Sequence, residues 1–377
     1  MNAAAGAFDG LNKYIRITDI DEESRCYIDE NPVSPKGELD DKYLVLENDI
    51  LFARTGASTG KTYLYKRSDG KLYFAGFLIR ISVNCDNNST FVYNATLTDR
   101  YNRWVRLTSM RSGQPGINSQ EYSSYKTYYP LLPEQDKIAS FLKKLDQRIE
   151  KQRQLVEALK SYKRGALSKL FPKKGETTPE YRFAGFTELW KRRKALELAE
   201  YSKGNGYSKG DLTEKGTPII LYGRLYTKYQ FAIDEVDTFA IPKTGSVYSQ
   251  GNEVIVPASG ETAEDIARAS AVEKSGVLLG GDLNILRPFD LINPLFLALA
   301  ISNGEAQKEL AKKAQGKSVV HIHNSDIQEI NMSYPLREEQ DRIVSFFRFL
   351  EQLVALHQRK LNEYENIKAG LLQQLFV

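Results

Sequence analysis

Residues 129–171 read YPLLPEQDKIASFLKKLDQRIEKQRQLVEALKSYKRGALSKLF, and residues 334–376 read YPLREEQDRIVSFFRFLEQLVALHQRKLNEYENIKAGLLQQLF. The two stretches align without a gap at an offset of 205, and 16 of their 43 positions are identical. Average composition would give roughly three identities by chance. Two unrelated amphipathic helices would share a hydrophobic pattern, but not Glu-Gln-Asp, Ser-Phe and a closing Leu-Phe in register. The stretch is therefore an internal repeat, which points to a duplicated architecture.

Both copies of the repeat have the pattern of a coiled-coil helix. Apolar residues recur at alternating spacings of four and three, from Ile138 to Leu170 and again from Ile343 to Leu375. This period of 3.5 residues faces a partner helix rather than a general core. Polar residues interrupt the seam at matching places, where Gln152 corresponds to His357 and Lys163 to Lys368. A polar seam residue costs stability but fixes the register, so we expect one defined pairing of the two helices.

A fainter similarity links the regions between the helices. Residues 48–56 align at an offset of 204 with residues 252–260, and Phe91 aligns with Phe296. We therefore expect an α+β chain in which two pseudo-repeated mixed α/β domains are separated by two long helices that form an antiparallel coiled coil. The expected bounds are 1–129 for the first domain, 130–172 for the first helix, 173–334 for the second domain and 335–377 for the second helix. About 30 residues at the front of the second domain have no counterpart in the first, which looks short at its N-terminus.

The composition excludes several classes of protein. The chain has 377 residues, 41% of them hydrophobic and 27% charged, which is typical of a globular protein. No apolar run approaches the ~18 residues of a membrane span, and the first residues do not form a signal peptide. Two cysteines cannot build a disulfide framework or a four-cysteine zinc site. A net charge of +4 permits a nucleic-acid partner without arguing for one.

Four motifs resemble catalytic or metal sites, and each fails on its context. Residues 55–62 lack the first glycine of a phosphate-binding P-loop and run into a β-type sequence instead of a helix. The Asn-Pro-Leu-Phe at 293–296 lacks the second proline of the amino-methyltransferase motif and fits a helix start. His321 and His323 have no evident third metal ligand, and residues 259–262 lack the first glycine of a nucleophile elbow. We therefore expect no catalytic activity, no metal site and no cofactor on this chain.

Glycine-rich loops with hydrogen-bonding and basic side chains occur at equivalent places in both domains. Such loops suit contacts to phosphates and base edges, although a purely structural turn is the competing interpretation of the first loop. In the first domain the candidate residues lie in 54–62 and 111–114, and in the second in 259–262 and 317–321. The candidate residues for such contacts are Arg54, Thr55, Gly56, Ser58, Thr59, Lys61, Arg111, Ser112, Gln114, Ser259, Glu261, Thr262, Lys317, Ser318 and His321.

The duplicated helices, each opened by Pro-Leu-x-x-Glu-Gln-Asp-x-Ile and closed by Leu-x-x-Leu-Phe, resemble the specificity subunit of type I restriction–modification systems. The resemblance covers nearly the whole chain and also includes residues 182–186, Trp190 and the stretch 49–56. It implies a non-catalytic subunit whose two target-recognition domains each read one half of a bipartite DNA sequence, with the helices as a ruler between them. It also implies DNA adenine methyltransferase and restriction/translocase subunits as partners. S-adenosylmethionine, ATP and Mg²⁺ are then expected on those partners.

Two alternatives remain open from the sequence. One is a specificity protein that serves a combined restriction–methylation enzyme of the type IIB kind, and the other is a coiled-coil adaptor that does not bind DNA. Under the main hypothesis the partners are double-stranded DNA and the two kinds of subunit, no membrane is involved, and the location is cytoplasmic.

Overall fold

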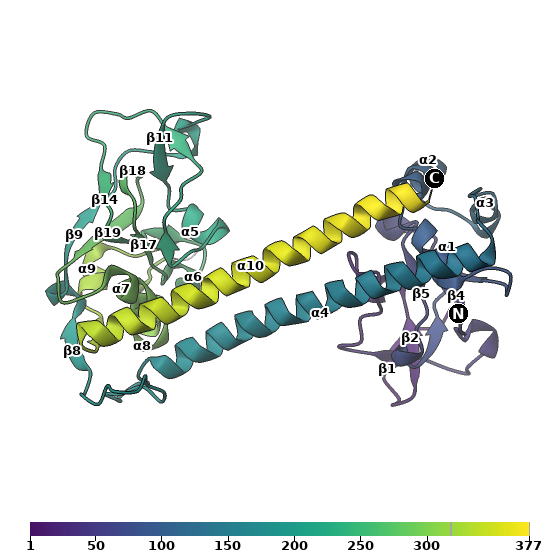
Figure 1. Ribbon diagram of the computed structural model, residues 1–377, viewed down its shortest axis with the longest axis horizontal. Helices are drawn as coiled ribbons and strands as arrows, with labels where there is room; N and C mark the ends of the chain where they lie inside the picture. Colours follow the sequence, from purple (N-terminus) through teal and green to yellow (C-terminus); the bar gives the residue numbers. More distant parts are fainter. Residues whose placement is uncertain (317–318, 377) are drawn as a thin grey trace. The chain divides into compact units, whose positions relative to one another are not determined.

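The computed structural model describes residues 1–316 and 319–376, and its contacts group into two compact units. The first unit is Met1–Gln154 with His357–Val377, and the second is Leu155–Leu356. The sequence predicted four segments, in which each long helix is separate from the domains. In the structure, each compact unit contains one α/β domain together with part of each long helix. Figure 1 shows the elements of both units.

In the first unit, three small sheets and three short helices form the α/β domain. The main sheet is antiparallel with the strand order β5-β4-β7, while β2 pairs with β6 in parallel and β1 with β3 antiparallel. The strands are β1 Ala5–Ala7, β2 Asn12–Ile15, β3 Val33–Pro35, β4 Asp49–Ala53, β5 Thr62–Leu64, β6 Lys71–Phe74 and β7 Leu78–Ser82, and the helices are α1 Ser89–Ala95, α2 Asp99–Thr108 and α3 Ser119–Ser123.

The second unit contains the same core arrangement with additional strands. Its central sheet has the order β12-β17-β15-β19-β9, and a second sheet has the order β10-β13-β11-β18-β14. The strands are β8 Lys191–Lys194, β9 Ala199–Lys203, β10 Leu212–Thr213, β11 Thr217–Ile220, β12 Ala232–Ile233, β13 Phe239–Ala240, β14 Tyr248–Gln250, β15 Glu253–Pro257, β16 Ser259–Gly260, β17 Ser270–Val272, β18 Ser275–Leu279, β19 Leu283–Pro288, β20 Val320–His321 and β21 Asn331–Tyr334, and the helices are α5 Arg224–Thr227, α6 Ala263–Ile266, α7 Pro294–Ile301, α8 Gly304–Lys313 and α9 Asn324–Gln328.

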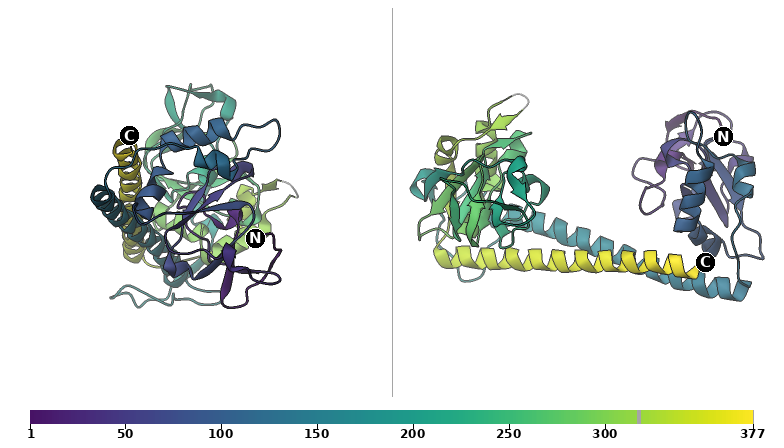
Figure 2. Two further views of the ribbon diagram at one scale, coloured as in Figure 1. Left: turned by 90° about the vertical axis from the view of Figure 1, so that its right-hand side faces the viewer. Right: turned by 90° about the horizontal axis from the view of Figure 1, so that it is seen from above.

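The two long helices are α4 Leu132–Leu170 and α10 Arg337–Leu375, which begin and end close to the predicted bounds. All predicted seam positions are buried or half-buried in both helices. Within each unit the two helices lie side by side (Figure 2). In the first unit Asp146 pairs with Lys368 and Gln152 with His357, so the two helices run in opposite directions. The predicted antiparallel coiled coil is confirmed.

Each polar residue in the seam has a polar partner on the other helix. In the first unit, Gln152 donates to the backbone carbonyl of His357 at 2.8 Å, so the two equivalent residues contact each other directly. Lys368 pairs with Asp146 at 2.6 Å in the first unit. In the second unit its equivalent Lys163 pairs with Glu351 at 2.5 Å. Each lysine therefore has an acidic partner on the other helix, which fixes the register by hydrogen bonding and charge.

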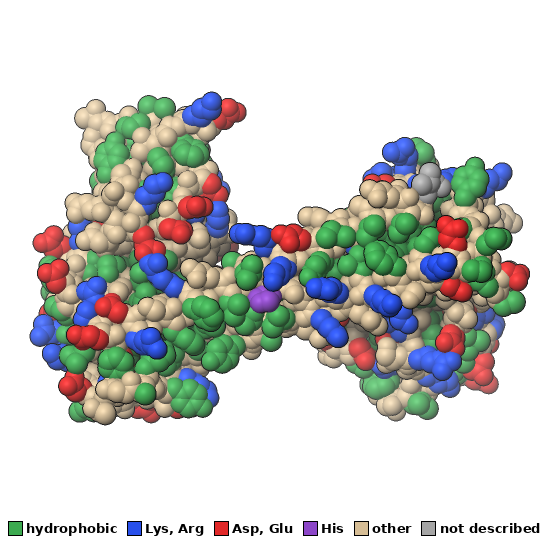
Figure 3. Space-filling view, viewed as in Figure 1, with side chains coloured by type: hydrophobic (Ala, Val, Ile, Leu, Met, Phe, Trp, Pro, Cys, Tyr) green, Lys and Arg blue, Asp and Glu red, His purple; other side chains and the backbone are tan. Residues whose placement is uncertain are grey.

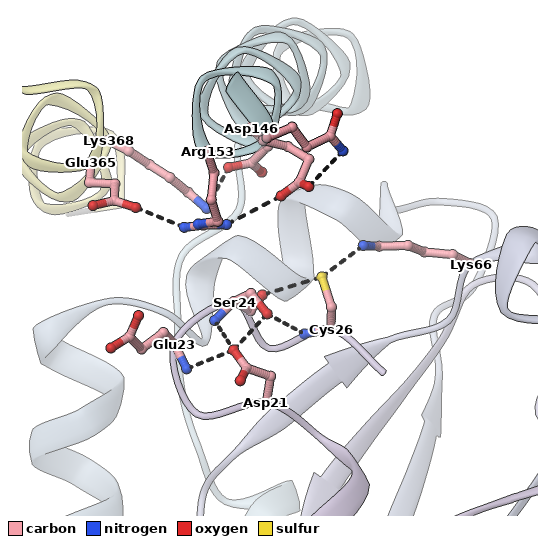
Figure 4. A network of polar contacts seen from close by, with 11 residues as sticks. Asp21, Glu23, Ser24, Cys26, Lys66, Asp146, Arg153, Glu365 and Lys368 are labelled. Atoms are coloured by element: carbon pink, nitrogen blue, oxygen red, sulfur yellow. Dashed lines mark hydrogen bonds and ion pairs between the residues drawn. The ribbon is translucent and has the colours of Figure 1, made fainter. Parts of the chain in front are cut away.

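Figure 4 shows polar contacts of the two long helices in the first unit and of the nearby loop at residues 21–26. Arg153 of α4 pairs with Glu365 of α10 at 2.7 Å. Nearby, Asp21 accepts hydrogen bonds from the backbone and hydroxyl of Ser24, which close the loop at residues 21–26. The contacts drawn within the loop and those drawn between the helices form two separate sets.

The Glu-Gln-Asp motif of the repeat fastens each long helix to the domain that precedes it. In the first unit, the Gln135 side chain accepts from the backbone N–H of Asn88 at 3.0 Å, and the Asp136 carboxylate accepts from the Asn88 amide at 2.8 Å. In the second unit, Gln340 and Asp341 make the same two bonds to Asn293, at 2.8 and 2.7 Å. Both asparagines also cap the helix that follows them, α1 or α7.

The closing Leu-Phe of the repeat packs on the same domain face. Phe376 at the end of α10 lies 4.7 Å from Phe91 in the first unit, measured between ring centroids. Phe171 at the end of α4 lies 5.6 Å from Phe296 in the second unit. Each domain is thus held by the beginning of the helix that follows it and by the end of the other helix. None of the described helices combines the length and apolar character that crossing a bilayer requires.

Candidate nucleic-acid interface

The two loops predicted in the first domain lie side by side. Backbone hydrogen bonds join them, from Gly56 N–H to the Pro115 carbonyl at 2.9 Å and from Ile117 N–H to the Arg54 carbonyl at 2.9 Å. Thr59 also donates from its hydroxyl to the Gly56 carbonyl at 2.8 Å, which closes the tip of the first loop. Residues 54–60 and 111–117 therefore form one continuous edge of the domain.

Helix α2 supports this edge from behind. Tyr101 donates to the Gly60 carbonyl at 3.0 Å. Gly60 has φ +87°, and a Cβ there would lie 2.4 Å from a methyl group of Val105. Only glycine fits this position without moving the loop or the helix, because both the backbone conformation and the close approach exclude a side chain.

The exposed face of α2 adds basic residues that the sequence analysis missed. Arg103 and Arg106 are exposed, and their guanidinium groups form no hydrogen bond or ion pair with the described residues, while Arg100 lies over the ring of Tyr128. The signal was present in the sequence, because arginines at spacings of three lie on one side of a helix. Together with the exposed Arg54, these side chains give the edge a positive charge.

Lys61 was predicted to contact nucleic acid, but the structure buries it. Its side chain is only 4% exposed, and its ammonium group donates to the Ile20 carbonyl at 3.1 Å and pairs with Glu22. It therefore holds the loop at residues 20–22 against the sheet and cannot reach a nucleic acid. Residues 62–64 form the strand β5, as the β-type sequence predicted, where a P-loop would require a helix.

The remaining predicted residues of the first domain lie on the joined loops. Arg111 is exposed, donates to the Thr108 carbonyl at 2.8 Å and pairs with Glu121, so its guanidinium is partly occupied by the protein. Ser112 and Gln114 are exposed, whereas Thr55 and Ser58 are half-buried.

In the second domain the structure brings the two predicted loops together in the same way. Strand β16 pairs with β20, which places Ser259 opposite His321, and the Ser259 hydroxyl lies 3.1 Å from His321 Nδ1. Glu261 and Thr262 are exposed, and Thr262 caps α6 by accepting from the Asp265 N–H. Lys317 and Ser318, which were also predicted here, lie outside the described residues.

A hollow of about 310 Å³ adjoins this part of the second domain. It lies between α6 and α8, which is the equivalent of α2. Glu264 lines it from α6, while Lys308 and Lys312 line it from α8. The second edge thus mixes acidic and basic side chains, and the first is mainly basic.

Burial raises the pKa of several tyrosines behind the two edges. Tyr122 donates to the Ala53 carbonyl at 2.7 Å, next to the first loop, and burial raises its pKa to about 12. Tyr226 donates to the Ser259 carbonyl at 2.8 Å, and burial raises its pKa as well. Both hydroxyls are therefore neutral hydrogen-bond donors that position the loops.

No arrangement for catalysis emerges from these residues. The described residues include no group of three or more His, Cys, Asp or Glu side chains that could hold a metal ion. On the face seen in Figure 3, acidic and basic side chains are interspersed, with no large field of one sign. The chemistry available is hydrogen bonding and local positive charge, which serve binding.

The fold defines a class of protein with two homologous domains, each clasped by both long helices and each presenting a pair of joined loops. A family model described as "Type I restriction modification DNA specificity domain" matches residues 5–160 and 187–366, and the chain belongs to this family. This confirms the predicted class, a sequence-specific recognition subunit that assembles with methyltransferase and restriction subunits and is not itself the catalyst.

Individual relatives agree with this assignment. The chain is 20% identical over 350 residues to the type I restriction enzyme MjaVIII specificity subunit of Methanocaldococcus jannaschii, which covers 88% of this chain and 79% of that protein. The fold is similar to the type I restriction–modification S subunit of M. genitalium, with a TM-score of 0.60, 16% identity and coverage of 98% and 89%. It is also similar to a chain in a structure concerned with complex assembly and conformational transition of the type I system, with a TM-score of 0.57, 18% identity and coverage of 96% and 90%.

Proposed function

We propose that each unit recognises one half of a bipartite DNA target through its joined loops and the adjacent helix. In the first unit the contacts come from Arg54, the loop at 111–114 and the arginines of α2. In the second unit they come from residues 259–262, His321 and the lysines of α8. The observation that carries the proposal is the convergence of two loops and α2 on one edge, where the exposed guanidinium groups of Arg54, Arg103 and Arg106 have no partner in the described part of the chain.

The chemistry of these side chains suits a division of labour. A planar guanidinium can bind guanine O6 and N7 in a bidentate manner, which specifies a base. Arginines on a helix face that flanks the loops suit phosphate contacts, which position the protein without reading sequence. We assign base recognition to Arg54 and phosphate contact to Arg103 and Arg106. S-adenosylmethionine, ATP and Mg²⁺ act on the partner subunits, and the complex works in the cytoplasm.

The experiment measures DNA binding by the chain in complex with its methyltransferase subunit. The target is first found by sequencing modified bases in the host genome. Fluorescence anisotropy against salt concentration then compares Arg54→Ala, Arg103→Ala and the control Arg67→Ala. The control changes an exposed arginine that pairs with Glu47 and lies at the opposite end of β5 from the loop.

The two roles predict different results. Arg54→Ala should cost about 1–3 kcal/mol and relax the preference at one position of one half-site. Arg103→Ala should weaken binding to every sequence and lower the salt slope by about one. If both variants bind like the Arg67→Ala control, the edge is not the DNA-binding surface. A chain that shows no sequence preference in the complex would instead support the adaptor.

A further inference from the structure

A third turn adjoins the joined loops of the first unit. It connects β6 to β7 and contains Phe77, whose carbonyl accepts from the backbone N–H of Arg54 at 3.0 Å. The register of β4 and β7 pairs Ala53 with Leu78, so Phe77 is the cross-strand neighbour of Arg54. The turn therefore lies on the same edge as the joined loops, although the sequence analysis did not single it out.

The same turn recurs in the second unit with a different side chain. It connects β18 to β19, and the backbone N–H of Ala258 donates to the Asp282 carbonyl at 2.8 Å. At the offsets of the repeat, Ala258 corresponds to Arg54 and Asp282 to Phe77. The backbone contact is kept, while both side chains of the pair differ between the two units.

Both turns present their side chain to solvent. Phe77 is 60% exposed, and Asp282 is exposed as well. Asp282 is exposed although β9 pairs with the neighbouring strand β19 in its unit, so the exposure of this position does not depend on what lies beside the sheet. Single exposed apolar residues are common on protein surfaces, and what singles out Phe77 is its place beside Arg54.

We propose that this turn reads one base pair of each half-site. Phe77 packs against the 5-methyl group of a thymine in the first half-site, and Asp282 accepts a hydrogen bond from the amino group of a cytosine in the second. The inference rests on the proposed function, because it takes the edge with the joined loops as the DNA-binding surface. In the major groove, thymine offers a methyl group to apolar side chains, and cytosine offers its N4 amino group to a carboxylate.

The spacing of the two side chains also places their bases. Cross-strand neighbours such as Arg54 and Phe77 have Cβ atoms about 5 Å apart. This distance is close to the rise of about 3.4 Å between successive base pairs. The A·T pair that Phe77 contacts therefore lies next to the G·C pair that Arg54 reads.

The first experiment removes the methyl group from the DNA. Duplexes of the identified target carry deoxyuridine in place of one thymine at a time, and fluorescence anisotropy measures their binding to the complex of the chain with its methyltransferase subunit. One thymine, next to the guanine whose recognition Arg54→Ala relaxes, should account for about a fourfold loss of affinity, the factor expected for burying one methyl group. The Phe77→Ala complex should bind the thymine and uracil duplexes equally.

Matched variants separate this contact from a general effect. Phe8→Ala, which alters another exposed phenylalanine of the first unit, should keep the fourfold difference. Asp282 has φ +57°, and glycine adopts this conformation readily. Asp282→Gly should therefore leave the fold intact, relax the preference for cytosine at one position of the second half-site, and preserve the effect of uracil in the first.

Three outcomes overturn the proposal. They are a first half-site in which no thymine shows the loss, a Phe77→Ala complex that still distinguishes thymine from uracil, and an Asp282→Gly complex with every base preference unchanged. A Phe77→Ala complex that binds all sequences equally more weakly also contradicts it, because that result indicates a wedge between bases. The proposed function survives these results as long as Arg54→Ala relaxes its own position, and it fails separately if Arg54→Ala and Arg103→Ala bind like Arg67→Ala.

Discussion

Replacement of Gln340 by alanine should destabilise the second unit by about 3 kcal/mol. The side chain is fully buried and makes three hydrogen bonds. It accepts from the Asn293 N–H at 2.8 Å and donates to the carbonyls of Leu291 at 3.1 Å and Pro335 at 3.0 Å. Each bond contributes roughly 1 kcal/mol, and the partners left unpaired in a buried place add to the loss.

The chain provides a separate probe for each unit, because its two tryptophans are Trp104 in the first and Trp190 in the second. Urea unfolding is followed by fluorescence in two single-tryptophan backgrounds, Trp190→Phe and Trp104→Phe. With a slope of about 2–3 kcal/mol per molar urea, the loss moves the Trp190 transition down by about 1 M or more. The Trp104 transition should move much less.

Gln135→Ala, the equivalent substitution in the first unit, is the control. Gln135 is buried in the first unit and makes the equivalent bonds to Asn88 and to the Pro130 carbonyl. It should therefore shift the Trp104 transition and spare the Trp190 transition. The reasoning is refuted if Gln340→Ala shifts its own probe by less than about 0.3 M, or if both probes move equally for both variants.

Three further outcomes follow from described contacts. Burial raises the pKa of Tyr122 to about 12, above its ordinary value of 10. The contribution of the protonated Tyr122 to stability should therefore be complete below pH 10 and lost as the pH rises through 12. Urea unfolding midpoints between pH 9 and pH 12, with tyrosinate absorbance at each pH, check this. Reversing the charge in Lys163→Glu should destabilise the second unit, and adding Glu351→Lys should restore about 1 kcal/mol, as measured by a double-mutant cycle. Gly60→Ala should cost about 3 kcal/mol and weaken DNA binding, because its Cβ collides with a valine of α2, whereas Gly113→Ala, which has open space around it, should be close to neutral in both assays.

The long helices and their pairing could be predicted from the sequence, because a coiled-coil seam is a local pattern. Gln152 and His357 interrupt both seams at the same step, and this coincidence indicated a fixed register before any contact was known. The sequence also shows that both helices begin with the same Glu-Gln-Asp, but it does not show that this motif binds the domain. The partner of Gln135 is Asn88, 47 residues away, and no periodicity connects a helix start with the cap of an earlier helix.

The candidate site was predicted only in part, for two physical reasons. The loops at 54–60 and 111–117 follow from their glycines and polar side chains, since such loops lie at the surface. Lys61 belongs to the same stretch, but its burial depends on the packing of residues 20–22, which is a tertiary contact. The arginines of α2 share one side of a helix, but that this side is the exposed one depends on the packing of Tyr101 and Val105 into the core, which is again a tertiary contact.

The first unit is built from two parts of the chain that lie far apart in the sequence, and this affects its synthesis on the ribosome. Its final segment, His357–Val377, follows Gln154 only after roughly 200 further residues. At about 5–20 residues per second, some 10–40 s pass between the two. During that interval the second domain can be completed, while Phe91 of the first domain waits without Phe376, the ring that covers it. The domain made first is therefore finished last, and the nascent chain carries an apolar patch that chaperones can bind until the last helix turns emerge.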